Sequence, residues 1–181
     1  MLNSDRIYLR LLEKEDLSSR VRWVNDKEVR KSLMFDWPLS ISKTEKWFQN
    51  QLMDDTKINF SIIHKETGRL VGMTGLIDIN IKHKRAQFYM TIGEKDFQGM
   101  RLPDENIPMV LEYAFEELGL NKVYLYTIDI NDKARHVYLR NGFKAEGVLR
   151  EHYFCVGQLR DLHVYSVLRK EWLETIKSQK Q

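Results

Sequence analysis

The feature that most constrains the fold is a strongly periodic apolar segment between two strand-like runs. Apolar residues recur at positions 107, 110, 111, 114, 115 and 118, a spacing that predicts an amphipathic helix. The run before it (86–92) alternates, and the run after it (122–130) is rich in β-branched and aromatic residues, so both predict strands. A strand–helix–strand unit places its two strands parallel in one sheet. Parallel strands that separate at one end leave a crevice there.

The rest of the chain predicts further strands and helices around this unit. Strands are expected at 6–12, 57–64, 70–81, 143–154 and 159–168, and helices at 14–25, from Ser42 onward and at 131–141. The sequence therefore predicts a mixed α/β (α+β-like) fold with a central, mostly antiparallel sheet and one splayed parallel strand pair flanked by helices. We expect one domain over residues 1–181, with a charged tail from about residue 169 that frays.

The helix from Ser42 carries a recognisable start signal. Ser42 followed by Glu45 three residues later is typical of a capping box. We expect this helix to bury side chains on neighbouring faces, namely Trp47, Phe48, Gln51 and Leu52.

Composition excludes several classes of protein. The chain is 43% hydrophobic and 30% charged, which is typical of a soluble globular domain. Its net charge of +3 is too small and dispersed to indicate nucleic acid, but it suits an anionic cofactor. The single cysteine, Cys155, forms no intramolecular disulfide, and no Cys/His spacing indicates a metal. Without a secretory apolar core or a membrane-spanning run, the expected location is cytoplasmic, with no membrane partner.

The segment IDINDKARHVYLRNGF (Ile128 to Phe143) and the order of elements resemble the GNAT N-acetyltransferases. The resemblance covers nearly the whole chain. Two further stretches, WVNDKEVRKSL (23–33) and EGVLREHYFCVGQLRD (146–161), are similar to the branch of ribosomal-protein N-terminal, polyamine and amino-sugar acetyltransferases. The resemblance implies a GNAT-like domain with acetyl-CoA as co-substrate, no metal, and direct attack of an amine on the thioester without a covalent intermediate.

The resemblance implies roles for two residues of that segment. Tyr138 stands where the family places the acid that protonates the CoA thiolate, and a phenol stays protonated at neutral pH. The alternative for Tyr138 is a core aromatic residue on an amphipathic helix. Asn131 matches the family residue that contacts the pantetheine arm, and Asn is also a common helix N-cap.

A strand is also implied to bind the cofactor. In the family, the strand that matches residues 86–92 carries a bulge, and its freed backbone groups bind the pantetheine and polarise the acetyl carbonyl. The backbone of Met90, Thr91 and Ile92 would do this here.

The loop after this strand departs from the family pattern. The resemblance implies that the pyrophosphate is held by Gln98, Gly99, Met100, Arg101 and Leu102. Arg101 stands where the first motif glycine is expected, and Pro103, which has no N–H, stands where the second Gly or Ala is expected. Asp104 is a good N-cap, but its carboxylate would repel a pyrophosphate. Either Arg101 supplies a cation and acetyl-CoA binds in a modified way, or the protein is a non-catalytic, binding or regulatory relative.

The general base is a second departure. Many relatives carry Glu where this chain has Gln87, and Gln cannot accept a proton. The candidates are Asp129 and His152, with Glu151 and a water relay as further alternatives. His152 has the most suitable unperturbed pKa.

The acceptor is expected to be a primary amine, either a small molecule, which we favour, or a peptide N-terminus. Its pocket would be built by the first two helices and the late hairpin, with Tyr89 and Tyr126 as lining candidates. A polyamine site would need several carboxylates there, and the available ones are Asp16, Glu28, Asp36 and Glu45. The sequence leaves the choice between monomer and homodimer open.

Overall fold

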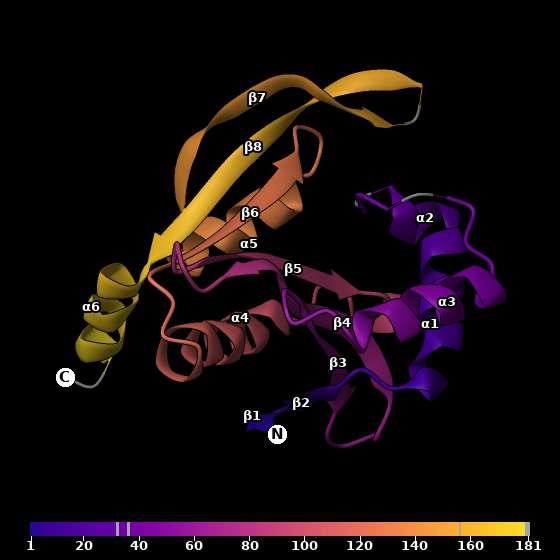
Figure 1. Cartoon of the computed structure of the whole chain (residues 1–181), viewed down its shortest axis with the longest axis horizontal. Coiled ribbons are helices and arrows are strands. Elements are labelled where there is room, and N and C mark those ends of the chain that lie inside the picture. Colours follow the sequence, from indigo (N-terminus) through magenta and orange to yellow (C-terminus); the bar gives the residue numbers. More distant parts are fainter. Residues whose placement is uncertain (32, 36, 156, 180–181) are drawn as a thin grey trace.

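A twisted eight-stranded sheet runs through the computed structural model, which describes residues 1–31, 33–35, 37–155 and 157–179 (Figure 1). The strand order is β1-β2-β3-β4-β5-β6-β8-β7, and every neighbouring pair is antiparallel except β5 and β6. The predicted mixed α/β fold is confirmed. The strands are β1 (Leu2–Asn3), β2 (Ile7–Leu11), β3 (Ile58–His64), β4 (Leu70–Asn80), β5 (Arg85–Ile92), β6 (Lys122–Ile128), β7 (Lys144–Cys155) and β8 (Gln158–Leu168).

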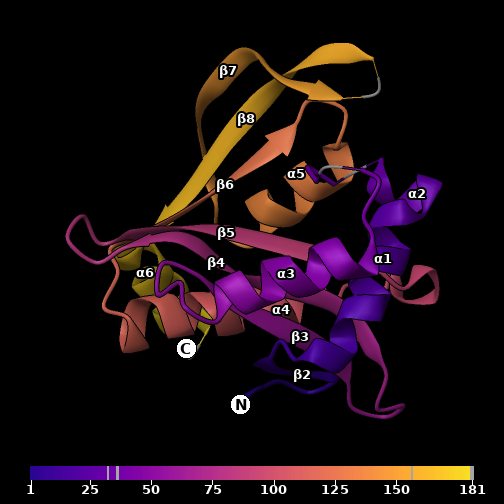
Figure 2. The ribbon, with the colours of Figure 1, turned by 45° about the vertical axis from the view of Figure 1, so that its right-hand side comes forward.

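Helices surround the sheet in separate groups. They are α1 (Leu17–Asn25), α2 (Lys27–Arg30), α3 (Ile41–Gln51), α4 (Pro103–Glu112), α5 (Asp132–Arg140) and α6 (Arg169–Gln179). Short 3₁₀ turns precede α1 (Lys14–Asp16) and follow β5 (Lys95–Phe97), and a π-helical segment (Tyr113–Glu117) continues α4. Figure 1 shows α1, α2 and α3 together at one end of the molecule, and Figures 1 and 2 both show the β7–β8 hairpin projecting away from β2 to β4.

The parallel pair separates as predicted. Strands β5 and β6 pair over three positions only, ending at Gln87 opposite Tyr124. Beyond that point β5 stays paired with β4 as far as Ile92, while β6 follows β8 as far as Ile128. Strand β5 keeps its hydrogen bonds to β4, and β6 keeps its hydrogen bonds to β8. The two strands can therefore diverge from each other, and an opening forms between them.

The start of α3 differs from the prediction. Ser40, not Ser42, caps this helix: its backbone is extended, and its hydroxyl accepts a hydrogen bond from the Lys43 N–H at 3.2 Å. Ser42 is already helical. Thr44 and Phe48 are buried, whereas Leu52, expected in the core, is 60% exposed because it lies beyond the last turn.

The charged tail also differs from the expectation that it frays. Residues 169–179 form α6, in which Trp172 is buried and its ring lies 5.4 Å from that of Phe115. The Glu171 carboxylate accepts a hydrogen bond from the Leu168 N–H at 3.0 Å, which satisfies a donor at the start of the helix. Trp172 and Ile176, which also packs against the core, anchor this helix together with the ion pair between Lys144 and Glu171 at 2.7 Å.

Candidate active site

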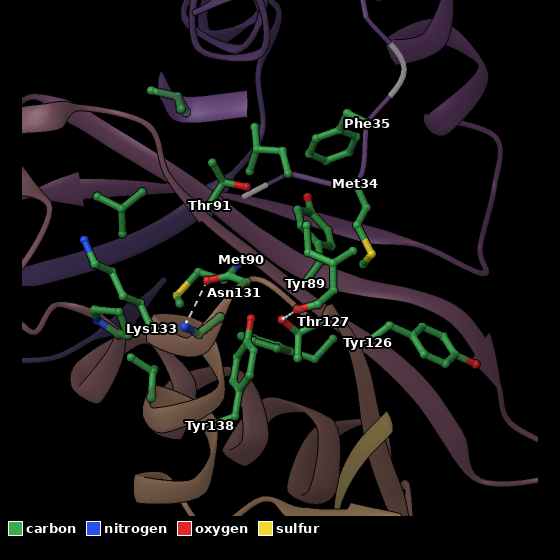
Figure 3. A pocket seen from close by; sticks show the side chains of 18 of the residues that line it. Met34, Phe35, Tyr89, Met90, Thr91, Tyr126, Thr127, Asn131, Lys133 and Tyr138 are labelled. Atoms are coloured by element: carbon green, nitrogen blue, oxygen red, sulfur yellow. Dashed lines mark hydrogen bonds between the residues drawn. The ribbon is translucent and has the colours of Figure 1, made fainter. Parts of the chain in front are cut away.

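A cavity of about 880 Å³ lies where β5 and β6 separate (Figure 3). It is lined by both diverging strands, by α5 on one side and by α1, α3 and residues 33–35 on the other. Of the residues predicted to bind acetyl-CoA or to act in catalysis, those that line the cavity are Met90, Thr91, Ile92, Gln98, Gly99, Asn131 and Tyr138. Those that lie outside its lining are Met100, Arg101, Leu102, Asp129 and His152.

Tyr138 combines a buried ring with a hydroxyl that points into the cavity (Figure 3). Its ring packs edge-on against Phe88 and Phe143, with centroids 6.3 and 5.7 Å away. Burial raises the pKa of the Tyr138 phenol to about 12. The phenol is therefore protonated at every working pH, and it is available as a hydrogen-bond donor. Tyr138 can therefore be both a core aromatic residue, through its ring, and a candidate acid, through its hydroxyl.

Asn131 joins the end of β6 to α5. Its side-chain oxygen accepts a hydrogen bond from the Ala134 N–H at 3.1 Å, so it is the N-cap of α5 (Figure 3). Lys133, two residues further on, lines the same cavity, and the sequence analysis missed it. The sequence contained one signal for Lys133: it is a cation in the first turn of α5, the helix that follows the diverging strand β6.

The edge of β5 is open, but not because of a bulge. The register between β4 and β5 is regular from Gly72 opposite Ile92 to Ile77 opposite Gln87. The irregularity of this pair lies on β4 after Ile77, where Asp78 has a positive φ of 49°. The predicted bulge in β5 was therefore wrong. Divergence of β6 leaves the inner edge of β5 unpaired beyond Gln87, which has the same effect on its backbone groups.

The loop 98–103 keeps the backbone of an anion-binding turn despite its side chains. Gly99 and Arg101 both have positive φ, 84° and 58°, so Arg101 adopts the left-handed conformation that favours glycine. Among the described residues, the N–H groups of the four residues 99–102 have no hydrogen-bond partner. Consecutive free N–H groups in such a turn form a concave site for an anion, so the residues present fit a pyrophosphate.

Pro103 and Asp104 interfere less with this loop than their residue types suggest. Pro103 is the first residue of α4, and there its missing N–H removes no helical bond. Asp104 is not the N-cap. It accepts hydrogen bonds from Arg101 Nε at 2.9 Å, Arg140 Nη2 at 2.8 Å and Asn141 Nδ2 at 3.0 Å. Desolvation opposes ionisation, but these donors outweigh it and lower the pKa of Asp104 to about 2.

Neither of the two predicted bases lines the cavity. Asp129 faces Arg160, with 3.8 Å between Oδ2 and Nη1, and its Oδ1 is buried without a hydrogen-bond partner among the described residues. His152 is exposed on β7, in a stretch where the register with β8 shifts. Neither side chain lines the cavity, so the geometry gives the base role no support.

The other end of the cavity is formed by the first helices. Arg20 of α1 and Trp47 of α3 line it together with Phe35, but no described residue of the late hairpin does. The Tyr89 hydroxyl, which was expected to line the acceptor site, donates a hydrogen bond to Asn59 Oδ1 at 2.6 Å, and burial raises the pKa of that phenol. Tyr126 also lines the cavity (Figure 3).

No three or more His, Cys, Asp or Glu side chains of the described residues gather closely enough to hold a metal ion. Among the same residues, every helix is too short or too polar to cross a lipid bilayer.

The profile of the acetyltransferase (GNAT) domain matches residues 6–144 of this chain. The chain belongs to the GNAT acetyltransferase family. It is 29% identical to spermidine N(1)-acetyltransferase of Vibrio cholerae over 174 residues, covering 94% of this chain and 97% of the relative. It is 30% identical to the putative ribosomal N-acetyltransferase YdaF of Bacillus subtilis, covering 93% and 94%.

Solved structures agree with this assignment. The GNAT fold described above superposes on spermidine N-acetyltransferase from Vibrio cholerae in complex with CoA and spermine with a TM-score of 0.87, at 29% identity, covering 94% of this chain and 99% of the other. The predicted family, its branch, the acetyltransferase activity and acetyl-CoA as acyl donor are confirmed by these matches.

Proposed function

We propose that this GNAT protein transfers the acetyl group of acetyl-CoA to the primary amine of a small molecule, by direct attack in the cavity between β5 and β6. One observation carries the proposal: the Tyr138 hydroxyl points into the same cavity that the unpaired edge of β5 lines. A donor for the leaving group and donors for the carbonyl therefore face one space, as acyl transfer requires.

Different parts of the cavity and of the loop beside it bind different parts of acetyl-CoA. The N–H groups of residues 99–102 hold the pyrophosphate, and Gln98 supports the loop by donating to the Ile92 carbonyl oxygen at 3.1 Å. The inner edge of β5, from Met90 to Ile92, binds the pantetheine opposite Asn131 and polarises the acetyl carbonyl.

Tyr138 acts on the leaving group. A thiol has an ordinary pKa of about 8.5, well below that of the Tyr138 phenol, so full proton transfer to the thiolate is uphill. Tyr138 therefore stabilises the departing thiolate mainly by donating a hydrogen bond, while the proton finally taken up comes from solvent.

The amine loses its proton to water. Among the described residues that line the cavity, Glu28 is the only one with a carboxylate or imidazole side chain, and it is bound to Lys31 at 2.9 Å. A water relay is the alternative that the sequence left open, and this lining supports it over Asp129 and His152. The reacting species is then the small fraction of neutral amine.

The acceptor class rests on the relatives and on the cavity. Relatives named for spermidine acetylation support a small-molecule amine, and the relative named for ribosomal acetylation keeps a peptide N-terminus as the competing class. Whether the protein acts as monomer or homodimer, and the expected cytoplasmic location, remain predictions.

Calorimetric titration with acetyl-CoA, followed by mass spectrometry of a panel of amines, tests the proposal. We expect binding in the micromolar range, about −8 kcal/mol, and acetylation of at least one small primary amine. No detectable binding would mean that the loop 98–103 does not hold the cofactor, and it would favour the non-catalytic alternative.

A further inference from the structure

Arg20 of α1 lies at the acceptor end of the cavity without an acidic partner among the described residues. Its guanidinium carbon lies 4.6 Å from the ring centroid of Phe35 and 4.3 Å from that of Trp47. Its Nε is buried and has no hydrogen-bond partner among those residues. Burial lowers the pKa of the Arg20 guanidinium, but an arginine stays charged in proteins. The cavity thus contains a cation that has lost much of its hydration.

The two aromatic rings do not use the hydrogen-bonding capacity of this cation. Stacking engages the faces of the guanidinium plane, whereas its N–H donors lie in that plane. A partner that approaches in the plane can therefore accept from Arg20 while Phe35 and Trp47 hold it in place. A planar carboxylate matches this fork of donors better than a hydroxyl or an amide does.

The charges around Arg20 favour the same kind of ligand. The charged side chains among the described residues that line the cavity are Arg20, Lys31, Lys57 and Lys133 on the basic side and Glu28 on the acidic side. Glu28 is paired with Lys31, and Lys57 is paired with Asp54 at 2.9 Å. A polycation entering this space would meet a field of its own sign.

The carboxylates that a polyamine site would need lie elsewhere or are already paired. Asp16 is buried and forms a bidentate pair with Arg10, and Glu45 lies 3.3 Å from Lys14 outside the cavity lining. Glu28 alone lines the cavity, and Asp36 lies outside the described residues.

We infer that the acceptor is a primary amine that also carries a carboxylate, and that Arg20 binds this carboxylate and so determines acceptor specificity. The inference rests on the proposed acetyltransferase function and deepens it. It separates this chain from the relatives named for spermidine, although the fold and the cofactor cleft are shared.

Matched acceptors test the inference on the wild-type protein. For chains of two to five methylene groups, kcat/KM is measured for the ω-amino acid, the diamine and the plain alkylamine of equal length. We expect the best ω-amino acid to exceed its matched diamine about tenfold, the effect of one charge-assisted hydrogen-bonded pair. A diamine preferred at every length would overturn the inference.

Substitution of Arg20 supplies the second test. Arg20→Gln should lower kcat/KM for the ω-amino acid about tenfold, mainly through KM, and leave the alkylamine within about twofold. Arg20→Lys keeps the charge but lacks the planar fork of donors, so its kcat/KM for the ω-amino acid should lie between those of the wild type and Arg20→Gln. Lys46→Gln, which removes one positive charge from an exposed site on α3 outside the cavity, is the matched control and should change neither. Equal losses for all acceptors in Arg20→Gln would mean a structural role and would contradict the inference.

The outcomes separate this inference from the proposed function. Acetylation of diamines or alkylamines alone would retain the proposed function and overturn the role of Arg20. Acetyl-CoA binding without acetylation of any amine would contradict both.

Discussion

The loop 98–103 and the cleft between β5 and β6, which we propose to bind the two halves of acetyl-CoA, depend on different properties of the chain. Besides the backbone edge of β5, the cleft relies on two side chains: Tyr138, whose ring is buried, and Asn131, which caps α5 (Figure 3). The loop relies on its backbone: Gly99 and Arg101 are left-handed, and among the described residues the N–H groups of residues 99–102 have no hydrogen-bond partner. The proposed site therefore depends on residue identity at Tyr138 and Asn131 and on backbone conformation in the loop.

This difference shows why the loop was hard to interpret from its residue types. A motif glycine is needed for its φ, and a residue such as Arg101 can supply that φ at a cost of roughly 1–2 kcal/mol. A catalytic hydroxyl has no such substitute. Substitutions in the cleft should therefore reduce turnover, and substitutions in the loop should reduce the affinity for acetyl-CoA.

The largest effect is expected from Tyr138→Phe. Loss of the donor to the thiolate should lower kcat about 100-fold and leave the Kd for acetyl-CoA unchanged, because the ring and its packing remain. Steady-state kinetics and calorimetry measure the two quantities. Tyr113→Phe, at a partly buried tyrosine outside the cavity lining, is the control and should retain full turnover. Unchanged turnover in Tyr138→Phe would remove the proposed role.

A smaller effect, on affinity alone, is expected from Gly99→Ala. A Cβ at Gly99 meets no atom within 4 Å, so the cost is conformational, about 1 kcal/mol at its φ of 84°. Relaxation of the loop should weaken acetyl-CoA binding about fivefold and leave kcat at saturation unchanged. Gly157→Ala is the control, because Gly157 has a φ of 74° and equally open space but lies at the hairpin turn. If both variants bind acetyl-CoA like the wild type, the backbone of the loop is not the binding element.

Asp104→Asn should change stability and not cofactor affinity. The pKa of Asp104 lies near 2 in the folded protein and near 3.9 in the unfolded chain, so its contribution is present above pH 4 and is lost as pH falls toward 2. The variant should lose about 1 kcal/mol at pH 7, after allowance for solvent screening, and about half of that at pH 3. Urea denaturation at the two pH values measures this. A large change in acetyl-CoA affinity would show that Asp104 repels the pyrophosphate.

The smallest effects are expected from His152→Ala and Asp129→Asn, because neither side chain lines the cavity. Both should keep kcat/KM within about twofold and retain the rise of the rate with pH that follows the pKa of the amine. The pH–rate profile of each variant, with amines of different pKa, checks this. A loss of tenfold or more, together with a changed profile, would restore that residue as the base.

Most of the fold was predictable because it follows from local patterns. The helical period after residue 107 and the flanking strands predicted the parallel pair, and Asn131 and Gly142 marked the ends of α5. The two errors in the helices have different causes. Ser40 and Ser42 are equally good caps, and a charged tail gives no sign that Trp172 has a buried site to occupy.

The site was less predictable because its residues come from distant parts of the chain. Arg20 is a polar residue among the apolar positions of α1, a signal that is visible in the sequence but has many explanations. Its meaning depends on Phe35, Trp47 and the other charges of the cavity, which only packing brings together.

The order of elements, the splayed parallel pair, the resemblance to the family and the group at Tyr138 could be read from the sequence, because periodicity and the spacing of residues within one segment are local properties. Contacts between segments determined that β5 is opened by divergence of β6, that Arg101 holds a glycine-like conformation, and that neither Asp129 nor His152 lines the cavity. They also placed Arg20 beside Phe35 and Trp47 in the lining of the cavity. Pairing, φ values and the balance of charge in a cavity are set by contacts between segments, and a linear pattern does not encode them locally.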